Sequence, residues 1–100
     1  MATLTKALAR AAFATSSGTL YTVPASTTTV VSNIGITNTA STAGTFSLSL
    51  NGVALHTTTA IAANTTVYID LKQVLAATQT ITGLASAVTI NYHISGVEIS

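Results

Sequence analysis

Charged side chains are nearly absent from this chain of 100 residues. Asp, Glu, Lys and Arg make up 5% of the sequence, against roughly 25% in typical soluble domains. The net charge of +1 comes from three cations and two anions, which are Lys6, Arg10, Lys72, Asp70 and Glu98. A nucleic-acid-binding surface requires clustered Lys and Arg, so this charge distribution excludes a nucleic acid as a partner.

Cysteine is absent as well, and the chain has a single proline. The absence of cysteine excludes disulfides and thiolate metal sites, so stability has to come from packing and hydrogen bonds, to which contacts with neighbouring subunits can add. No uninterrupted run of about 18 apolar residues occurs, so we expect no membrane-spanning helix and no membrane partner.

Groups that could perform acid–base or metal chemistry are few. Beyond Asp70 and Glu98, the chain offers only His56 and His93, and both histidines are predicted to point outward from strands. The sequence contains no nucleophile-elbow pattern, no glycine-rich phosphate loop and no zinc-ligand spacing. We therefore predict no catalytic residues, no cofactor and no bound metal, and we expect that the protein is not an enzyme.

Hydroxyl side chains take the place of the missing charges, with 21 Thr and 10 Ser beside 48% hydrophobic residues. Threonine favours strands because its branched Cβ packs well on a pleated surface. From Thr19 onward, alternating apolar and polar residues define seven or eight short strands with turn signals about every ten residues. This pattern predicts an all-β fold, an antiparallel β-sandwich of immunoglobulin-like or jelly-roll type, whose strand order remains open.

The clearest local signal is the pair Asn51-Gly52 between two alternating runs, "TFSLSL" and "VALHT". Asn and Gly tolerate the positive φ angles of a type I′ turn, which joins two antiparallel strands. A loop of two residues places Leu50 opposite Val53 and Leu48 opposite Leu55. All four, together with Phe46, are then predicted to share one inward face.

Several further positions follow from the same alternation. In three other segments we expect alternate residues to point toward the core. In one of them, "TTVYIDL", Tyr68 lies between two inward residues and is expected to point outward. A glycine where the last strand changes phase indicates a β-bulge at Gly96, and "KQVLAAT" could form one helical turn. The residues expected to point inward are Val30, Ile34, Ile36, Val67, Ile69, Leu71, Val88, Ile90, Tyr92 and Ile94.

The N-terminal segment permits two interpretations. Leu4, Leu8 and Ala12 fall at helical spacing, whereas an extended chain places Lys6 and Arg10 on one side. The same two cations interrupt the apolar stretch that a secretory signal needs, so a targeting peptide is not favoured. We predict an arm or short helix over residues 1–17, followed by a β-sandwich domain over residues 18–100.

Three segments together resemble small structural proteins of tailed bacteriophages, particularly those that infect actinobacteria. They contain, in order, "YTVP", a strand ending in "NT", the hairpin "SLNG", a turn "IAAN" and the closing "HISGVEI". The resemblance covers nearly the whole chain, from about Thr3 to Ile99. Each motif is modest alone, and their shared order carries the specificity.

The resemblance implies a virion component, either a capsid decoration protein that binds and stabilises the outer shell or a minor tail or fibre-associated protein. Its partners would then be the major capsid protein and copies of itself, with a trimer expected from the closed symmetries common on capsids. Such a protein is made in the host cytoplasm and located in the virion. The candidate contacts with shell or subunits are Lys6, Arg10 and Tyr68, and Tyr68 is also the candidate for binding carbohydrate on the host surface.

Overall fold

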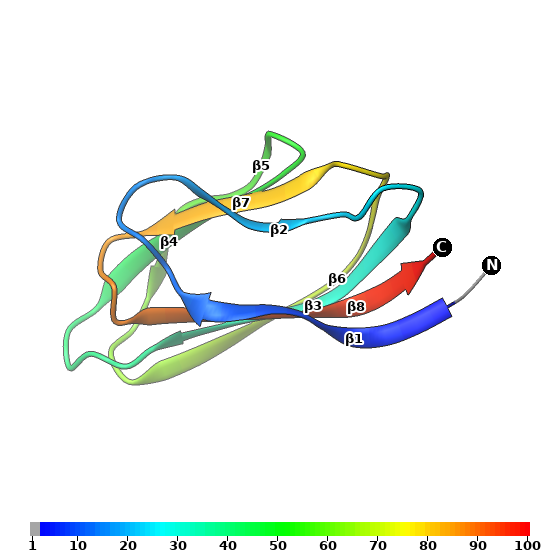
Figure 1. Cartoon of the computed structure of the whole chain (residues 1–100). Coiled ribbons are helices and arrows are strands. Elements are labelled where there is room, and N and C mark those ends of the chain that lie inside the picture. Colours follow the sequence, from blue (N-terminus) through cyan, green and yellow to red (C-terminus); the bar gives the residue numbers. More distant parts are fainter. Residues whose placement is uncertain (1–2) are drawn as a thin grey trace.

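Two antiparallel β-sheets stack face to face in this protein (Figure 1). The computed structural model describes residues 3–100, with the side chain of Lys6 outside the described part. It contains eight strands, and no helix occurs between residues 3 and 100, so the predicted all-β antiparallel sandwich is confirmed. The strands are β1 (Thr3–Ala12), β2 (Gly18–Thr22), β3 (Thr28–Asn38), β4 (Gly44–Leu50), β5 (Val53–Ile61), β6 (Thr65–Leu75), β7 (Thr80–Ala85) and β8 (Ile90–Ile99).

The strand order identifies which kind of sandwich this is. Strand β1 pairs with β8, β2 with β7, β3 with β6 and β4 with β5, so the two halves of the chain run antiparallel to each other. The tip of this long hairpin is the Asn51-Gly52 turn, near the middle of the sequence. Folding the hairpin over itself gives the sheets β1-β8-β3-β6 and β2-β7-β4-β5, which is the order of a jelly roll and not of an immunoglobulin domain.

The central hairpin confirms the predicted turn and corrects the predicted register. Asn51 and Gly52 have φ angles of 50° and 78°, and Leu50 lies opposite Val53. Two residues further on, however, Leu48 faces His56 and not Leu55, because β5 contains an extra residue there. Val53 is 70% exposed and Leu55 half-buried, so the prediction that these two residues share the inward face with Leu48 is wrong for Val53.

The N-terminal segment forms a strand of the sandwich. Residues 3–12 make β1, which pairs along its length with β8 at the edge of the first sheet. The predicted short helix is therefore wrong, and the extended alternative describes the backbone. Pairing with β8 satisfies the backbone donors and acceptors on one side of β1, which outweighs the helix propensity of its alanines. The helical turn predicted near residue 72 is also wrong, because β6 continues to Leu75.

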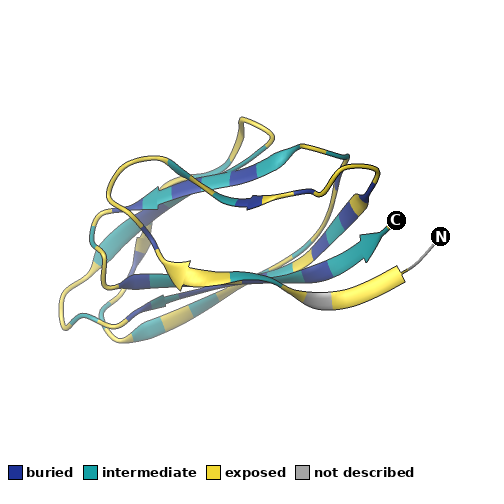
Figure 2. Cartoon of the chain, viewed as in Figure 1, coloured by how far each residue is buried: buried dark blue, intermediate teal, exposed yellow. Residues whose placement is uncertain are grey.

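The core lies between the two sheets, where buried and exposed residues alternate along most strands (Figure 2). The predicted inward residues Ile34, Ile36, Ile90, Tyr92 and Ile94 are buried, and Val67, Ile69 and Leu71 are half-buried against the core. Val88 was expected inside but is 64% exposed in the turn before β8. The buried hydrophobic residues are Phe13, Tyr21, Val23, Val31, Ile34, Ile36, Phe46, Leu48, Ile61, Leu75, Ile81, Ala85, Ile90, Tyr92 and Ile94.

An irregularity crosses the first sheet at the level of Gly96. Strand β3 inserts Ser32 between the residues that face Gly96 and Ser95. Strand β1 inserts Leu8 one position further along, between the residues that face Ser95 and Ile94. The predicted bulge therefore exists at this place, but the extra residues lie on the strands beside β8. Gly96 allows the close approach, since a Cβ there would lie 2.3 Å from the Val30 carbonyl oxygen.

The insertion of Ser32 changes which side chains of β3 point toward the core. Val31 is fully buried whereas Val30, predicted to share a face with Ile34 and Ile36, is only half-buried. Since side chains alternate along a strand, one extra residue moves every later side chain to the opposite face. Val30 therefore points outward, in a row with Val97 of β8 and Val74 of β6.

Candidate functional site

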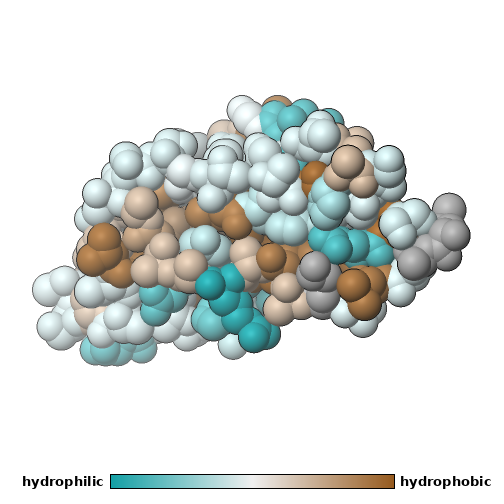
Figure 3. Space-filling view, in the orientation of Figure 1, coloured by the Kyte–Doolittle hydropathy of each residue, from teal (hydrophilic) through white to brown (hydrophobic). Residues whose placement is uncertain are grey.

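Two surfaces of the sandwich are available for binding, one on the outside of each sheet. We call the outside of β1-β8-β3-β6 the Tyr68 face, and the outside of β2-β7-β4-β5 the hydroxyl face. Most of the molecular surface in Figure 3 has the pale colour of near-neutral hydropathy, and saturated teal is confined to separate patches. The two faces differ in which ionisable side chains they carry.

Two of the predicted contact residues lie in one row on the Tyr68 face. Arg10 of β1 is opposite His93 of β8, His93 is opposite Gly35 of β3, and Gly35 is opposite Tyr68 of β6. Arg10, His93 and Tyr68 are exposed, so the predicted outward orientation of Tyr68 and His93 is confirmed. The row crosses all four strands, and no pattern in the sequence indicates that these residues align.

Lys6, the third predicted contact residue, lies on β1 with its backbone opposite Gly96. Its side chain is outside the described part, so the predicted contact of Lys6 stays a prediction. On the same strand Leu8 is the inserted residue between Lys6 and Arg10. The expectation that Lys6 and Arg10 point to one side likewise depends on the Lys6 side chain and stays a prediction.

The ring of Tyr68 lies across its neighbouring strand because of Gly35. A Cβ at Gly35 would lie 3.0 Å from Cε1 and 3.2 Å from Cδ1 of Tyr68, and 3.9 Å from Cβ of His93. The ring therefore rests over the glycine backbone and buries Gly35, while 70% of the Tyr68 surface remains exposed. An aromatic ring that covers a glycine of the adjacent strand is a known stabilising device in sheets.

Hydrogen-bonded polar side chains flank this row on both sides. On one side Asn33 Nδ2 donates to Asp70 Oδ1 at 3.0 Å, and on the other the hydroxyls of Thr37 and Thr66 lie 3.0 Å apart. Both pairs connect β3 to β6 two residues away from Gly35 and Tyr68, in opposite directions along the strands. The sheet thus fixes donors and acceptors around the exposed ring.

Two shallow hollows adjoin the row at either edge of the face. One is lined by Arg10, Ala11, Ala12, Asn91 and His93 between β1 and β8. The other is lined by Ser32, Asp70, Leu71 and Lys72 at the bulged part of β6. Every charged residue whose described side chain lies on this face therefore borders one of the two hollows.

The hydroxyl face has a different chemistry. None of the strands β2, β7, β4 and β5 contains Asp, Glu, Lys or Arg. One row across the four strands consists of Thr19, Thr82, Ser49 and Ala54. The other outward side chains, inferred from the buried residues between them, are Thr22, Thr45, Ser47, Ala60, Thr80 and Leu84.

His56 of β5 does not contribute to the hydroxyl face. Its ring packs against Phe46 with a centroid distance of 5.6 Å, and its Nδ1 lies 3.3 Å from the Thr59 hydroxyl. His56 is half-buried, so the prediction of an outward His56 is wrong. The extra residue at Leu55 shifts His56 into register with the buried Leu48.

A polar contact joins the two sheets inside the sandwich. The Tyr21 hydroxyl of β2 donates to Glu98 Oε2 of β8 at 2.5 Å and lies 2.9 Å from the Thr29 hydroxyl of β3. Burial and the hydrogen bond to the Glu98 carboxylate raise the pKa of Tyr21 to about 12, although the Thr29 hydroxyl acts in the opposite direction. Tyr21 therefore links β2 of one sheet to β3 and β8 of the other.

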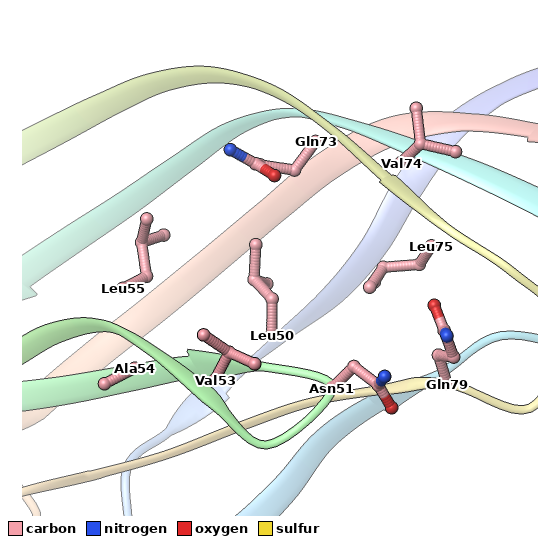
Figure 4. Close-up of a pocket in the computed structure, with 9 residues that line it drawn as sticks. All are labelled: Leu50, Asn51, Val53, Ala54, Leu55, Gln73, Val74, Leu75 and Gln79. Atoms are coloured by element: carbon pink, nitrogen blue, oxygen red, sulfur yellow. The ribbon is translucent and has the colours of Figure 1, made fainter.

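An apolar groove opens between the edges of the two sheets, where β5 and β6 lie near each other. Figure 4 shows Leu50 and Leu55 from the central hairpin and Leu75 from the end of β6 around this space. Gln73 and Gln79 add polar groups at its rim. Such a groove can hold an apolar group, but it contains no ionisable side chain that would support chemistry.

Within residues 3–100, no group of three His, Cys, Asp or Glu side chains is arranged to hold a metal ion. The same part of the chain also has no helix of the length and hydropathy that crossing a bilayer requires.

Comparisons with known proteins reveal similarities of fold. No protein-family model matches this chain, and no curated protein matches it. The catalytic domain of Agl-KA aligns with 91% of this chain, at 13% identity and a TM-score of 0.45. A pentameric capsid protein isolated from metagenomic phage sequences aligns with 90% of it, at 14% identity and a TM-score of 0.37.

CBM35 from Paenibacillus barcinonensis aligns with 98% of this chain and 88% of its own length, at 7% identity and a TM-score of 0.42. The chain spans 21% of the Agl-KA catalytic domain and 60% of the phage capsid protein. At these identities the likeness is one of fold alone.

Proposed function

We propose that this protein is a structural component of a bacteriophage virion, and specifically a decoration protein that binds the outer capsid shell through its hydroxyl face. The proposed partners are the major capsid protein and further copies of the chain, arranged as trimers, and the role is not enzymatic. The resemblance of the ordered segments from "YTVP" to "HISGVEI" supports a virion component. A compact jelly roll, a fold that occurs in viral capsid proteins, is compatible with this role.

The observation that carries the proposal is the lack of ionisable residues throughout the hydroxyl face. Burying a charged side chain without a partner costs several kcal/mol, whereas a hydroxyl group can exchange its water for a hydrogen bond to a partner. Removal of water from the hydroxyl face, for example from the row Thr19, Thr82 and Ser49, therefore costs little free energy. Many such weak contacts add up when subunits are arrayed at fixed positions on a shell.

A charge placed in the centre of this face tests the proposal. Thr82→Lys introduces a cation at a half-exposed outward position of β7, and we expect binding to shells to fall by at least about 100-fold. Thr66→Lys introduces the same cation on the Tyr68 face and serves as the matched control. Co-sedimentation with purified shells that lack the protein measures binding, and circular dichroism confirms that both variants fold.

The outcome discriminates between the two faces. Loss of binding in Thr82→Lys alone supports contact through the hydroxyl face, and loss in Thr66→Lys alone refutes it. Failure of the unaltered chain to bind shells at any concentration refutes the decoration role altogether. A tail or fibre location is the alternative, and quantitative proteomics of virions separates the two, because a shell protein is present in hundreds of copies and a tail-tip protein in a handful.

A further inference from the structure

We propose that the Tyr68 face contains a carbohydrate-binding site, in which a pyranose ring of a neutral oligosaccharide stacks on the exposed ring of Tyr68. Polar side chains of the same face would bind its hydroxyl groups. The site consists of Tyr68, Gly35, His93, Arg10 and the pair Asn33 and Asp70. This inference does not depend on the virion role, because it concerns the sheet opposite to the hydroxyl face.

The stacking platform is preformed. The edge of the Tyr68 ring lies over Gly35, at about the contact distance of a Cβ, while most of the side chain faces solvent. A tyrosine has only two side-chain torsions, so a ring already supported by the sheet loses little conformational freedom when a ligand binds. A sugar ring presents an apolar face of C–H groups, which fits an aromatic ring held in this way.

The polar groups around the platform match the hydroxyls of a sugar. A hydroxyl group both donates and accepts hydrogen bonds, so its site must offer both functions. Asp70 accepts, Arg10 donates, and Asn33 and His93 can do either. Asn33 already fixes the Asp70 carboxylate through the 3.0 Å hydrogen bond, and a carboxylate retains further lone pairs for a ligand.

The length of the row indicates an oligosaccharide and not a single sugar. Neighbouring strands lie about 4.8 Å apart, so the four-strand row from Tyr68 to Arg10 extends over about 14 Å. Its far end reaches the hollow lined by Arg10, Asn91 and His93. One sugar unit on Tyr68 would therefore leave room for at least one more unit toward β1.

Charge favours a neutral ligand. The cations Arg10 and Lys72 border opposite hollows, and Lys72 shares its hollow with the anion Asp70. A phosphate backbone or a strongly acidic polysaccharide requires clustered cations, which this face lacks among its described side chains. A protein partner would be expected to cover an apolar centre, but the exposed Tyr68 ring is surrounded by polar residues.

Binding of one chain to one oligosaccharide is expected to be weak. A single exposed aromatic platform with surface hydrogen bonds is consistent with a dissociation constant of about 1 mM. Several copies on one particle would raise the avidity by orders of magnitude. Detection therefore requires a method that is sensitive to weak binding, and NMR titration of the ¹⁵N-labelled protein is suitable.

The experiment titrates the full chain with three soluble probes, the tetrasaccharides of mannose, xylose and N-acetylglucosamine, each to about 10 mM. We expect at least one probe to shift the backbone amide signals of Gly35, Tyr68 and His93 in a saturable manner. Tyr68→Ala is expected to weaken this binding at least about tenfold, and Tyr68→Phe, which keeps the ring, to retain it.

Two further variants separate a binding role from a structural one. Gly35→Ala adds a Cβ that displaces the Tyr68 ring, so it should weaken binding in a folded protein. Val74→Ala is the control on the same strand, since Val74 is 64% exposed and Tyr68 is 70% exposed. This substitution should leave binding unchanged. If Tyr68→Ala does not fold, the titration of the unaltered chain and of Tyr68→Phe still decides the question.

Absence of saturable shifts with all three tetrasaccharides overturns the proposal. Shifts centred on the groove around Leu50 and Leu75 also overturn it, because they place the ligand elsewhere. Equal binding by Tyr68→Ala and the unaltered chain does the same, since the ring is then not the platform.

Discussion

The hydrogen bond between Tyr21 and Glu98 leads to a prediction about stability in alkaline solution. The folded protein holds the pKa of Tyr21 at about 12, against 10.0 for an ordinary tyrosine. In the unfolded chain, Tyr21 loses its proton near pH 10, while in the folded chain it keeps the proton until about pH 12. The unfolded state therefore binds fewer protons in this window, and the free energy of unfolding falls as the pH rises.

The size of this effect follows from the shift. One pKa unit corresponds to about 1.4 kcal/mol, so the rise from 10.0 to about 12 corresponds to about 3 kcal/mol. The Tyr21 contribution is fully present below about pH 10 and is lost by about pH 12. Because Tyr21 is 9% exposed, water screens this interaction less than it would at the surface.

The perturbation that isolates this contribution is Tyr21→Phe, which keeps the ring and removes the titrating group. Its matched control is Tyr68→Phe, which removes the phenol of a 70% exposed tyrosine. Near neutral pH, Tyr21→Phe should cost about 1–3 kcal/mol, since Glu98 and Thr29 lose a hydrogen-bond partner. Urea unfolding followed by circular dichroism gives the free energy of unfolding at each pH.

We expect the difference in the free energy of unfolding between the unaltered chain and Tyr21→Phe to shrink by up to about 3 kcal/mol between about pH 10 and pH 12. Near neutral pH, Tyr68→Phe should change the free energy of unfolding by less than about 0.5 kcal/mol. A difference for Tyr21→Phe that stays constant between about pH 10 and pH 12 would refute the reasoning, because it would mean that the fold does not retain the Tyr21 proton.

Two predictions test the packing. Leu48→Ala should lower the free energy of unfolding in urea by about 2–5 kcal/mol, because Leu48 is fully buried. Val53 is 70% exposed, so Val53→Ala should change it by less than about 0.5 kcal/mol. Equal effects of the two substitutions would contradict the described register. Gly96→Ala should cost about 3 kcal/mol, because the new Cβ would lie 2.3 Å from the Val30 carbonyl oxygen. Gly18→Ala, where a Cβ meets no atom within 4 Å, is its control in the same assay, and a tolerated Gly96→Ala would show that the strands can separate at this point.

The sequence was sufficient for features that depend on neighbouring residues. The Asn51-Gly52 turn was predictable because positive φ angles favour these two residue types wherever they occur. The outward Tyr68 was predictable because Val67 and Ile69 alternate with it along a strand. In both cases the information lies within a few residues of the feature.

Features that depend on distant strands were not predictable in the same way. The extra residue Ser32 reverses β3, so Val31 and not Val30 is buried, yet nothing near Ser32 marks it as an insertion. Similarly, β1 forms because it pairs with β8, and most of the paired residues are more than 80 positions apart in the sequence. The alanines of β1, taken by themselves, favour a helix. The error about His56 has the same origin in an insertion within β5.

The candidate sugar site shows this division most clearly. Tyr68 and Arg10 were separate candidates in the sequence, and neither pointed to Gly35 or His93. The registers of β6, β3 and β8 bring these residues into one row, and register over such distances is set by core packing. Gly35 carries a signal that could have been used, since a glycine within an alternating strand indicates close approach of another group.

The two faces of the sandwich differ most in what their desolvation would cost. Covering the Tyr68 face would require burial of Arg10, Asp70 or Lys72, and each needs a partner of opposite charge or several hydrogen bonds. Covering the hydroxyl face buries only hydroxyl, methyl and leucine side chains, whose hydrogen-bonding groups can pair with almost any polar partner. The lower cost of desolvation therefore favours the hydroxyl face as the sheet that attaches in the proposed role. Attachment in that orientation leaves Tyr68 directed away from the attached surface, where a soluble ligand can reach it.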